Sequence, residues 1–220
     1  SSDLRFFQIP IEILPVERPR TPYSYGSTLY LIEKYSVSYL NTFSDLLDEE
    51  RENDFIYDLT GFGISSFSDA GHPELPDLPF SPQEVRISAE KLNQLERKEF
   101  FLNESSTETN FRSIAGRSRI IHMATHSKVN ADNPLFSALY MHTGPNPDTT
   151  DRMPVNQQDG VIYAYELFDL NLNADLIFLS SCESGTGGYL EGTGILGFSR
   201  AFSYAGAQSL SMNLWPIRDQ

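Results

Sequence analysis

Two short runs of apolar residues, each followed at once by small polar residues, are the clearest pattern in the chain. The first run is residues 119–124 (RIIHMA), and the second is residues 175–180 (DLIFLS). Short apolar runs bounded by polar residues are typical of strands that a parallel sheet buries on both faces. We therefore expect two core strands, one ending just before His126 and the other just before Cys182.

Other segments have weaker strand, helix and turn patterns. Residues 55–64 suit a strand that runs into a turn, and the proline-rich residues 65–81 suit a loop. Ser81 is the expected N-cap of the next helix, with Pro82 at its first position and Glu84 as capping-box partner. The remaining expected elements are a short helix at 107–115, a loop or hairpin at 128–159, helices at 162–168 and 195–204, a left-handed cap at Gly206 and a strand at 209–214.

The beginning of the chain differs from the rest in composition. Four prolines lie between residues 10 and 22, and their missing amide donors favour extended segments. We expect residues 1–28 to be a lead-in or linker with an edge strand at 6–14, and residues 29–220 to form the main domain. Because strands and helices alternate there, the predicted fold class is α/β, with a mostly parallel sheet, helices on both faces and a site at the carboxyl ends of the strands.

Composition and charge narrow the classes of function. The chain of 220 residues is 40% hydrophobic, and no stretch approaches the roughly 18 apolar residues that a membrane span needs. Thirty acidic against 16 basic side chains give a net charge of -14, which argues against direct nucleic-acid binding and favours basic peptides as partners. The alternative is that the acidity serves only solubility. The sequence begins without a signal-peptide pattern, and its single cysteine excludes an internal disulfide, so we expect a reducing cytoplasm.

Cys182 and His126 are the candidate chemical pair. Adjacent parallel strands would bring their carboxyl ends together, and a neighbouring imidazole is a recurrent means of generating a reactive thiolate. The backbone amides of Cys182 and of Ser127, just after His126, could donate hydrogen bonds to an oxyanion. Residues alone leave an alternative open, because a lone cysteine is often a small buried hydrophobe.

The positions of the other histidines in the sequence predict structural roles for them and do not predict a metal site. His122 lies within the first apolar run and is expected to be a core residue with a hydrogen-bond partner, while His72 and His142 lie beside glycine or proline in loops. In a strand, His122 and His126 would be two pleats apart, which is poor spacing for zinc ligands. We expect neither a metal nor a cofactor.

A set of short motifs resembles a known family. The residues that carry the resemblance are 121–126, 159–160, 173–185, 191–192, 197–202, 205–207, 214–217 and Asp219, with weaker signatures at 34–39, 78–80 and 84–85. In this order, and over residues 29–220, they resemble the CHAT family of caspase-like cysteine peptidases.

The resemblance implies a caspase-like three-layer αβα sandwich and endopeptidase activity through a dyad of His126 and Cys182, without metal or cofactor. It also implies that the chain is the carboxyl-terminal module of a larger protein, preceded by a helical-repeat sensor region or acting with a partner chain. The family continues with further helix and sheet beyond the segment that ends here at Gln220, so we expect a carboxyl-terminal part to be missing.

Two features of the candidate site stay open at this point. The family usually has glycine directly after the catalytic histidine, whereas this chain has Ser127, for which a positive φ would be strained. The family's specificity pocket maps to Asp159 and to residues 214–219, where Trp215 could be a pocket wall or core and Asp219 could pair with a basic P1 side chain. Asp159 could instead cap a helix or a turn before Gly160.

Three functions are therefore weighed. The leading one is a regulated endopeptidase that cleaves protein substrates. The second is a catalytically weak or inactive caspase-like module that signals by binding. The third is an esterase that uses Ser184, although the Gly-x-Ser-x-Gly elbow of that class is missing from the sequence.

Overall fold

The computed structural model describes residues 14–17, 26, 28–35, 54–130, 132–144, 158–181 and 193–212, with the backbone alone for 193–197. The chain divides into two compact units, Ser1–Glu49 and Glu50–Gln220. The predicted boundary after residue 28 stays a prediction.

The first unit contains one short described helix, α1 (Leu31–Lys34). The Glu33 side chain accepts a hydrogen bond from the Tyr30 backbone N–H at 2.9 Å, and an isolated antiparallel bridge joins Pro15 to Tyr30. Residues 31–34 thus form a single helical turn. The edge strand expected at 6–14 lies almost wholly outside the described residues.

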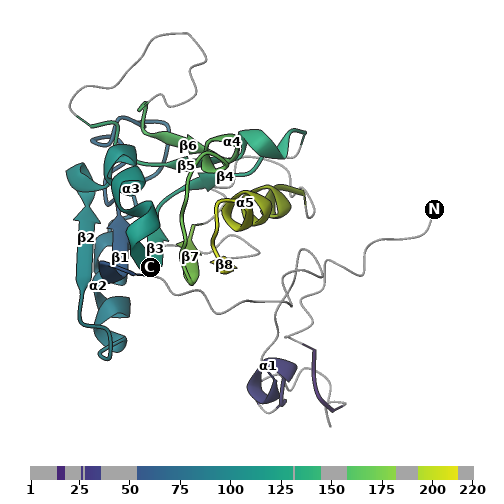
Figure 1. Cartoon of the computed structure of the whole chain (residues 1–220). Helices are drawn as coiled ribbons and strands as arrows, with labels where there is room; N and C mark the ends of the chain where they lie inside the picture. Colours follow the sequence, from purple (N-terminus) through teal and green to yellow (C-terminus); the bar gives the residue numbers. More distant parts are fainter. Residues whose placement is uncertain are drawn as a thin grey trace. The chain divides into compact units, whose positions relative to one another are not determined.

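The second unit is built on a parallel sheet. Its described strands are β1 (Tyr57–Gly63), β2 (Lys98–Leu102), β3 (Ser118–Ala124), β7 (Leu176–Ser180) and β8 (Ser209–Met212). They lie in the order β2-β1-β3-β7-β8, and every described pairing among them is parallel (Figure 1). The two predicted core strands are therefore confirmed as β3 and β7, and they are neighbours.

A smaller antiparallel sheet follows the carboxyl end of β3. It is formed by β4 (Ser127–Lys128), β5 (Ala138–Tyr140) and β6 (Val161–Tyr163). The helix predicted at 162–168 is partly wrong, because residues up to Tyr163 pair in β6 and only α4 (Ala164–Leu167) is helical. Single 3-10 turns at η5 (Asn103–Ser105), η6 (Ala115–Arg117) and η7 (Pro134–Phe136) connect these elements.

Helices cover both faces of the parallel sheet. Alternation along the strands turns Ile121 and Met123 of β3, with Ile177 of β7, into a core shared with α3 (Glu108–Ile114) and α5 (Thr193–Tyr204). On the other face α2 (Ser81–Lys91) packs so closely on β1 that a side chain at Gly61 would overlap Val85. The predicted three-layer α/β architecture is confirmed, as is the left-handed Gly206 after α5, with φ of 107°.

The predicted capping of α2 is wrong. The helix begins at Ser81 itself, Phe80 is the cap residue, and no cap side chain makes a hydrogen bond to the helix end. The Ser81 hydroxyl instead accepts from the Ile64 backbone N–H at 3.1 Å and donates to the Ala124 carbonyl at 2.5 Å. The hydroxyl that the sequence pattern predicted would cap the helix therefore makes hydrogen bonds to the ends of two strands instead.

Candidate active site

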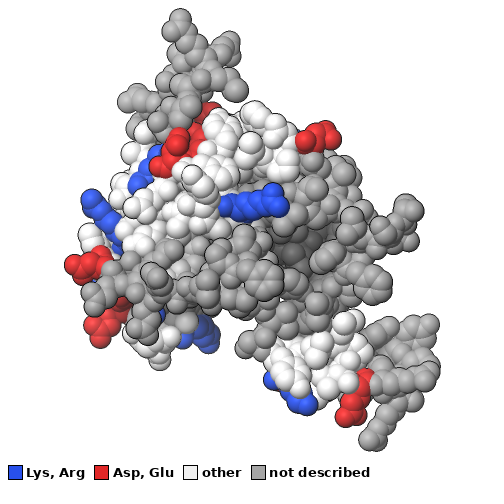
Figure 2. Space-filling model, turned by 45° about the vertical axis from the view of Figure 1, so that its right-hand side comes forward, with Lys and Arg blue, Asp and Glu red and all other residues white. Residues whose placement is uncertain are grey.

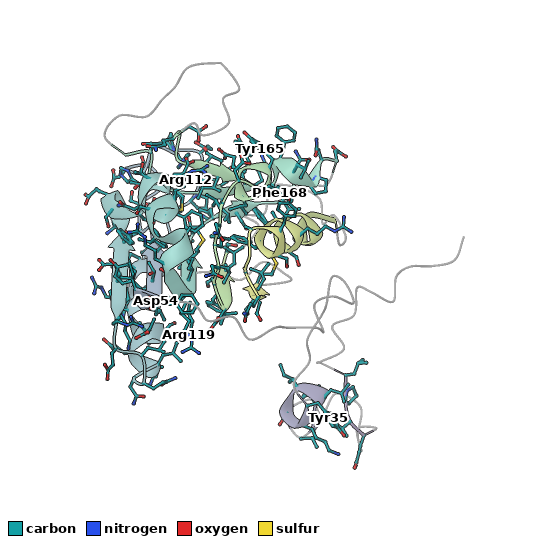
Figure 3. All side chains as sticks on the ribbon, in the orientation of Figure 1. Tyr35, Asp54, Arg112, Arg119, Tyr165 and Phe168 are labelled. Carbon is teal, nitrogen blue, oxygen red and sulfur yellow. The ribbon has the colours of Figure 1, made fainter. Side chains whose placement is uncertain are left out.

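The register between β3 and β7 sets the geometry of the candidate site. At the start of the strands, the guanidinium of Arg119 (labelled in Figure 3) contacts the Asp175 carboxylate at 2.7 Å. At their carboxyl ends Ala124 is paired with Ser180. His126 comes two residues after Ala124, and Cys182 comes two residues after Ser180. Cys182 itself lies outside the described residues, which end here at the buried Ser181.

His126 is held by a loop that precedes α2. Its ring exposes little surface (3% for the residue), packs on Phe67 with ring centroids 4.5 Å apart, and places Nε2 2.7 Å from the Pro76 carbonyl oxygen. A carbonyl oxygen can only accept, so Nε2 carries the proton and donates it. In the neutral ring the basic nitrogen is then Nδ1.

Residues 65–80 are the loop that supplies the Pro76 carbonyl, and hydrogen bonds fix its shape. The Phe67 backbone N–H donates to the Asp77 carboxylate at 2.9 Å, and the His72 Nε2–H donates to the Met141 carbonyl at 2.9 Å. The sequence predicted a loop here but not its role, because a backbone carbonyl leaves no signal in the identity of its side chain.

Ser127 adopts an ordinary extended conformation. It lies in β4 opposite Leu139, and among the described non-glycine residues only Asn103 and Asn173 have positive φ. The serine that replaces the family's glycine therefore causes no left-handed strain at this position.

Asp159 holds a turn. Its Oδ1 accepts from the Val161 backbone N–H at 2.9 Å, and the intervening Gly160 has φ of 84°. The turn-holding alternative is thus the contact that the structure contains, and a substrate-binding role for Asp159 stays a prediction. Trp215 and Asp219 lie outside the described residues.

Comparison of the sequence with models of protein families identifies the family of this chain. The model of the CHAT domain matches residues 1–220. The chain belongs to the CHAT-domain family. This family is related to the caspase-like cysteine peptidases. The match includes the first 28 residues, and a comparison with curated proteins gives no match.

On the face shown in Figure 2, the Lys and Arg side chains of the described residues lie apart from one another, some of them beside acidic side chains, and do not form a basic stripe. No helix in the described part of the chain combines the length and apolar character needed to cross a bilayer. Within the same residues, no three His, Cys, Asp or Glu side chains are grouped as a metal site would require.

The CHAT domain also contains a buried charge cluster that the sequence did not reveal. Arg112 of α3 (labelled in Figure 3) contacts Glu108 at 2.8 Å and Glu166 at 3.2 Å. Both carboxylates are almost fully buried. Burial raises the pKa of Glu108 to about 7, although Arg112 lowers it, and Glu166 and Asp159 add to the increase. The spacing of Glu108 and Arg112 is typical of an exposed helical ion pair, so the sequence gives no sign of burial.

We expect the Glu108→Gln variant to flatten the pH dependence of stability. The folded pKa of about 7 exceeds the ordinary value of 4.5, so the protonated carboxyl stabilises the fold fully below pH 4.5, and this contribution is lost as the pH rises through 7. As the pH rises over this range, the unfolding free energy of the wild type should therefore decrease by about 3 kcal/mol, a decrease that Glu108→Gln should lack. Urea unfolding between pH 4 and 8 measures it.

The exposed Glu104→Gln variant is the matched control and should follow the wild-type pH curve. If Glu108→Gln also follows the wild-type curve, the buried carboxyl does not carry the proton assigned to it.

Proposed function

We propose that this CHAT domain is a cysteine endopeptidase with Cys182 as nucleophile and His126 as general base and acid. The supporting observation is the pairing of β3 with β7, in which Ala124 opposite Ser180 is followed on both strands, two residues later, by the candidate residues. The Pro76 carbonyl adds support, because it fixes the tautomer in which His126 Nδ1 can take a proton.

The proposed reaction needs only groups of the chain, the peptide and water. His126 takes the Cys182 proton, and the thiolate attacks the scissile carbonyl to give a tetrahedral oxyanion. The backbone amides of Ser127 and Cys182 donate to that oxyanion. The C–N bond then breaks as protonated His126 gives its proton to the leaving amine. Water, deprotonated by His126, hydrolyses the thioester and restores the thiol.

The proposed substrates are proteins cleaved after a basic P1 residue. Asp159 and Asp219 are the candidate pocket carboxylates, and Trp215 is a candidate wall. The net charge of -14 supports a basic substrate. We place the domain in the cytoplasm, as the effector module of a larger protein whose helical-repeat region or partner chain regulates it.

A peptidyl chloromethyl ketone with arginine at P1 tests this function. We expect the full chain to be alkylated once, at Cys182, because a substrate-like probe presents its electrophile to the activated thiolate. Peptide mapping by mass spectrometry locates the adduct. A matched probe with glutamate at P1 should react at least about tenfold more slowly, as like charges disfavour its binding.

Failure of every such probe to label Cys182 in folded protein would contradict the proposal. Equal labelling by the arginine and glutamate probes would contradict the proposed acidic pocket but not the proposed peptidase activity.

The alternative function is a CHAT domain that acts by binding. It is favoured by the burial of His126, whose exposed fraction of 3% leaves little of the ring for a substrate to reach. A binding module needs no activated thiol. Alkylation of Cys182 by iodoacetamide over a range of pH separates the two functions, since a midpoint near about 8.5 indicates an ordinary thiol and a lower midpoint an activated one.

A further inference from the structure

The first turn of α2 makes polar contacts with the carboxyl ends of three neighbouring strands. Through its hydroxyl, Ser81 joins the backbone N–H of Ile64, just after β1, to the carbonyl of Ala124 at the end of β3. Both contacts are buried, and the backbone of α2 lies against Gly63 at the end of β1. The position of α2 is therefore coupled to that of the strand that precedes His126.

Glu84, three residues after Ser81 in the same first turn of α2, joins β3 to β7. Its Oε1 lies 3.3 Å from Nε2 of His122, and its carboxylate also accepts a hydrogen bond from the Ser180 hydroxyl. His122 is 2% exposed, is paired in register with Phe178, and contacts that ring at a centroid distance of 4.7 Å. Glu84 thus joins His122, two residues before the end of β3, to Ser180, the last residue of β7.

The state of the Glu84 carboxyl agrees with this bridge. Burial raises the pKa of Glu84, but the hydrogen bonds from His122 and Ser180 lower it by a larger amount, so the net pKa lies below the ordinary value. The carboxylate is therefore ionised at neutral pH, and hydrogen bonds to an ionised acceptor are about twice as strong as neutral ones.

Ser180 is the last residue of β7, two residues before Cys182, just as Ala124 is the last residue of β3, two residues before His126. One helical turn consequently contacts both strand ends, Ser81 at Ala124 and Glu84 at Ser180.

We propose that Glu84 is a positioning residue for Cys182. Through its contacts with Ser180 and His122, Glu84 fixes the end of β7 relative to the end of β3. The inference rests on the peptidase function proposed above and adds to it a residue that touches neither thiol nor substrate. Its effect on the reaction is to hold the nucleophile at the distance from His126 that allows proton transfer, since small misplacements of reacting groups greatly slow catalysis.

The test compares Glu84→Ala, Glu84→Gln, Ser180→Ala and the double variant Glu84→Ala/Ser180→Ala in the full chain. For each, the rate of Cys182 alkylation by iodoacetamide is measured from pH 5 to 10, together with kcat and KM on a peptide with arginine at P1. Glu90→Ala, exposed on the same helix, is the matched control. Thermal unfolding of every variant shows which ones fold.

We expect Glu84→Ala to reduce kcat at least about tenfold with little change in KM, and to move the alkylation midpoint towards about 8.5. Ser180→Ala should act in the same direction. Glu84→Gln should recover most of the rate because its amide oxygen can still accept from Ser180. The double variant should be no slower than the slower single variant, because both changes break one contact.

If the wild type has an activated thiol while Glu84→Ala and Ser180→Ala keep its midpoint and kcat, the positioning role is overturned and the peptidase function stands. Effects that add in the double variant, or that Glu90→Ala reproduces, also overturn it. A wild-type midpoint near about 8.5 contradicts the peptidase function itself, and the positioning role with it. Should Glu84→Ala not fold, Glu84→Gln and Ser180→Ala decide.

Discussion

Replacing Cys182 with alanine is expected to abolish cleavage of a basic-P1 peptide while the fold persists. The chain has no second cysteine, so no other thiol can form the thioester, and the remaining binding groups give at most a small residual rate. Initial rates on a fluorogenic peptide, with circular dichroism to verify folding, measure the effect.

Ser184→Ala is the control for Cys182→Ala. The serine stands two residues after the cysteine and was the nucleophile of the weaker esterase alternative. We expect it to retain full activity. Cleavage that survives in Cys182→Ala, or that disappears in Ser184→Ala, would assign the reaction to another group.

Replacing His126 with alanine should reduce kcat by about 10²–10⁴-fold at pH 7, the usual contribution of a general acid–base group. The residual rate should rise steeply with pH, because hydroxide can generate the thiolate near its ordinary pKa of about 8.5 when the imidazole is gone. A pH–rate profile of His126→Ala beside the wild type measures both effects.

His142→Ala is the matched control for the loss of an imidazole. His142 accepts a hydrogen bond from the Gly144 backbone N–H at its Nδ1 and serves a local turn, so its loss should leave kcat near wild type. A wild-type rate in folded His126→Ala would exclude His126 as the base.

The part of the site that the sequence predicted best is the pair of strands. Both apolar runs are bounded by polar residues, and the pattern located β3 and β7 to within a residue at each end. Their adjacency and register could not be predicted from the pattern alone, because they depend on contacts such as Arg119 with Asp175 and on packing between the helical layers.

The elements that the sequence missed lack a distinctive pattern for physical reasons. β2 has the sequence KEFFL, is half-buried along its whole length and lies at an edge of the described sheet, so neither alternation nor a long apolar run marks it. Ser81 satisfied the rules for an N-cap, yet its hydroxyl bonds to two strand ends. Sequence rules for helix capping predict hydrogen-bond partners nearby in the chain, and they cannot predict tertiary partners such as these.

The buried polar groups illustrate the same limit. Glu108 and Arg112 have the spacing of a surface pair, and only the fold brings Glu166 beside them and excludes water. Pro76 contributes its carbonyl, a group that every residue carries, so its contact with His126 required the path of the whole loop.

The distance between Cys182 Sγ and His126 Nδ1 in a crystal structure of this chain tests the central claim most directly. The account predicts about 3 to 4 Å, with Nε2 still donating to the Pro76 carbonyl and with room for the looser geometry of a substrate-free site. A thiol on the opposite face of the sheet from the imidazole, or one enclosed in hydrocarbon away from it, would contradict the account.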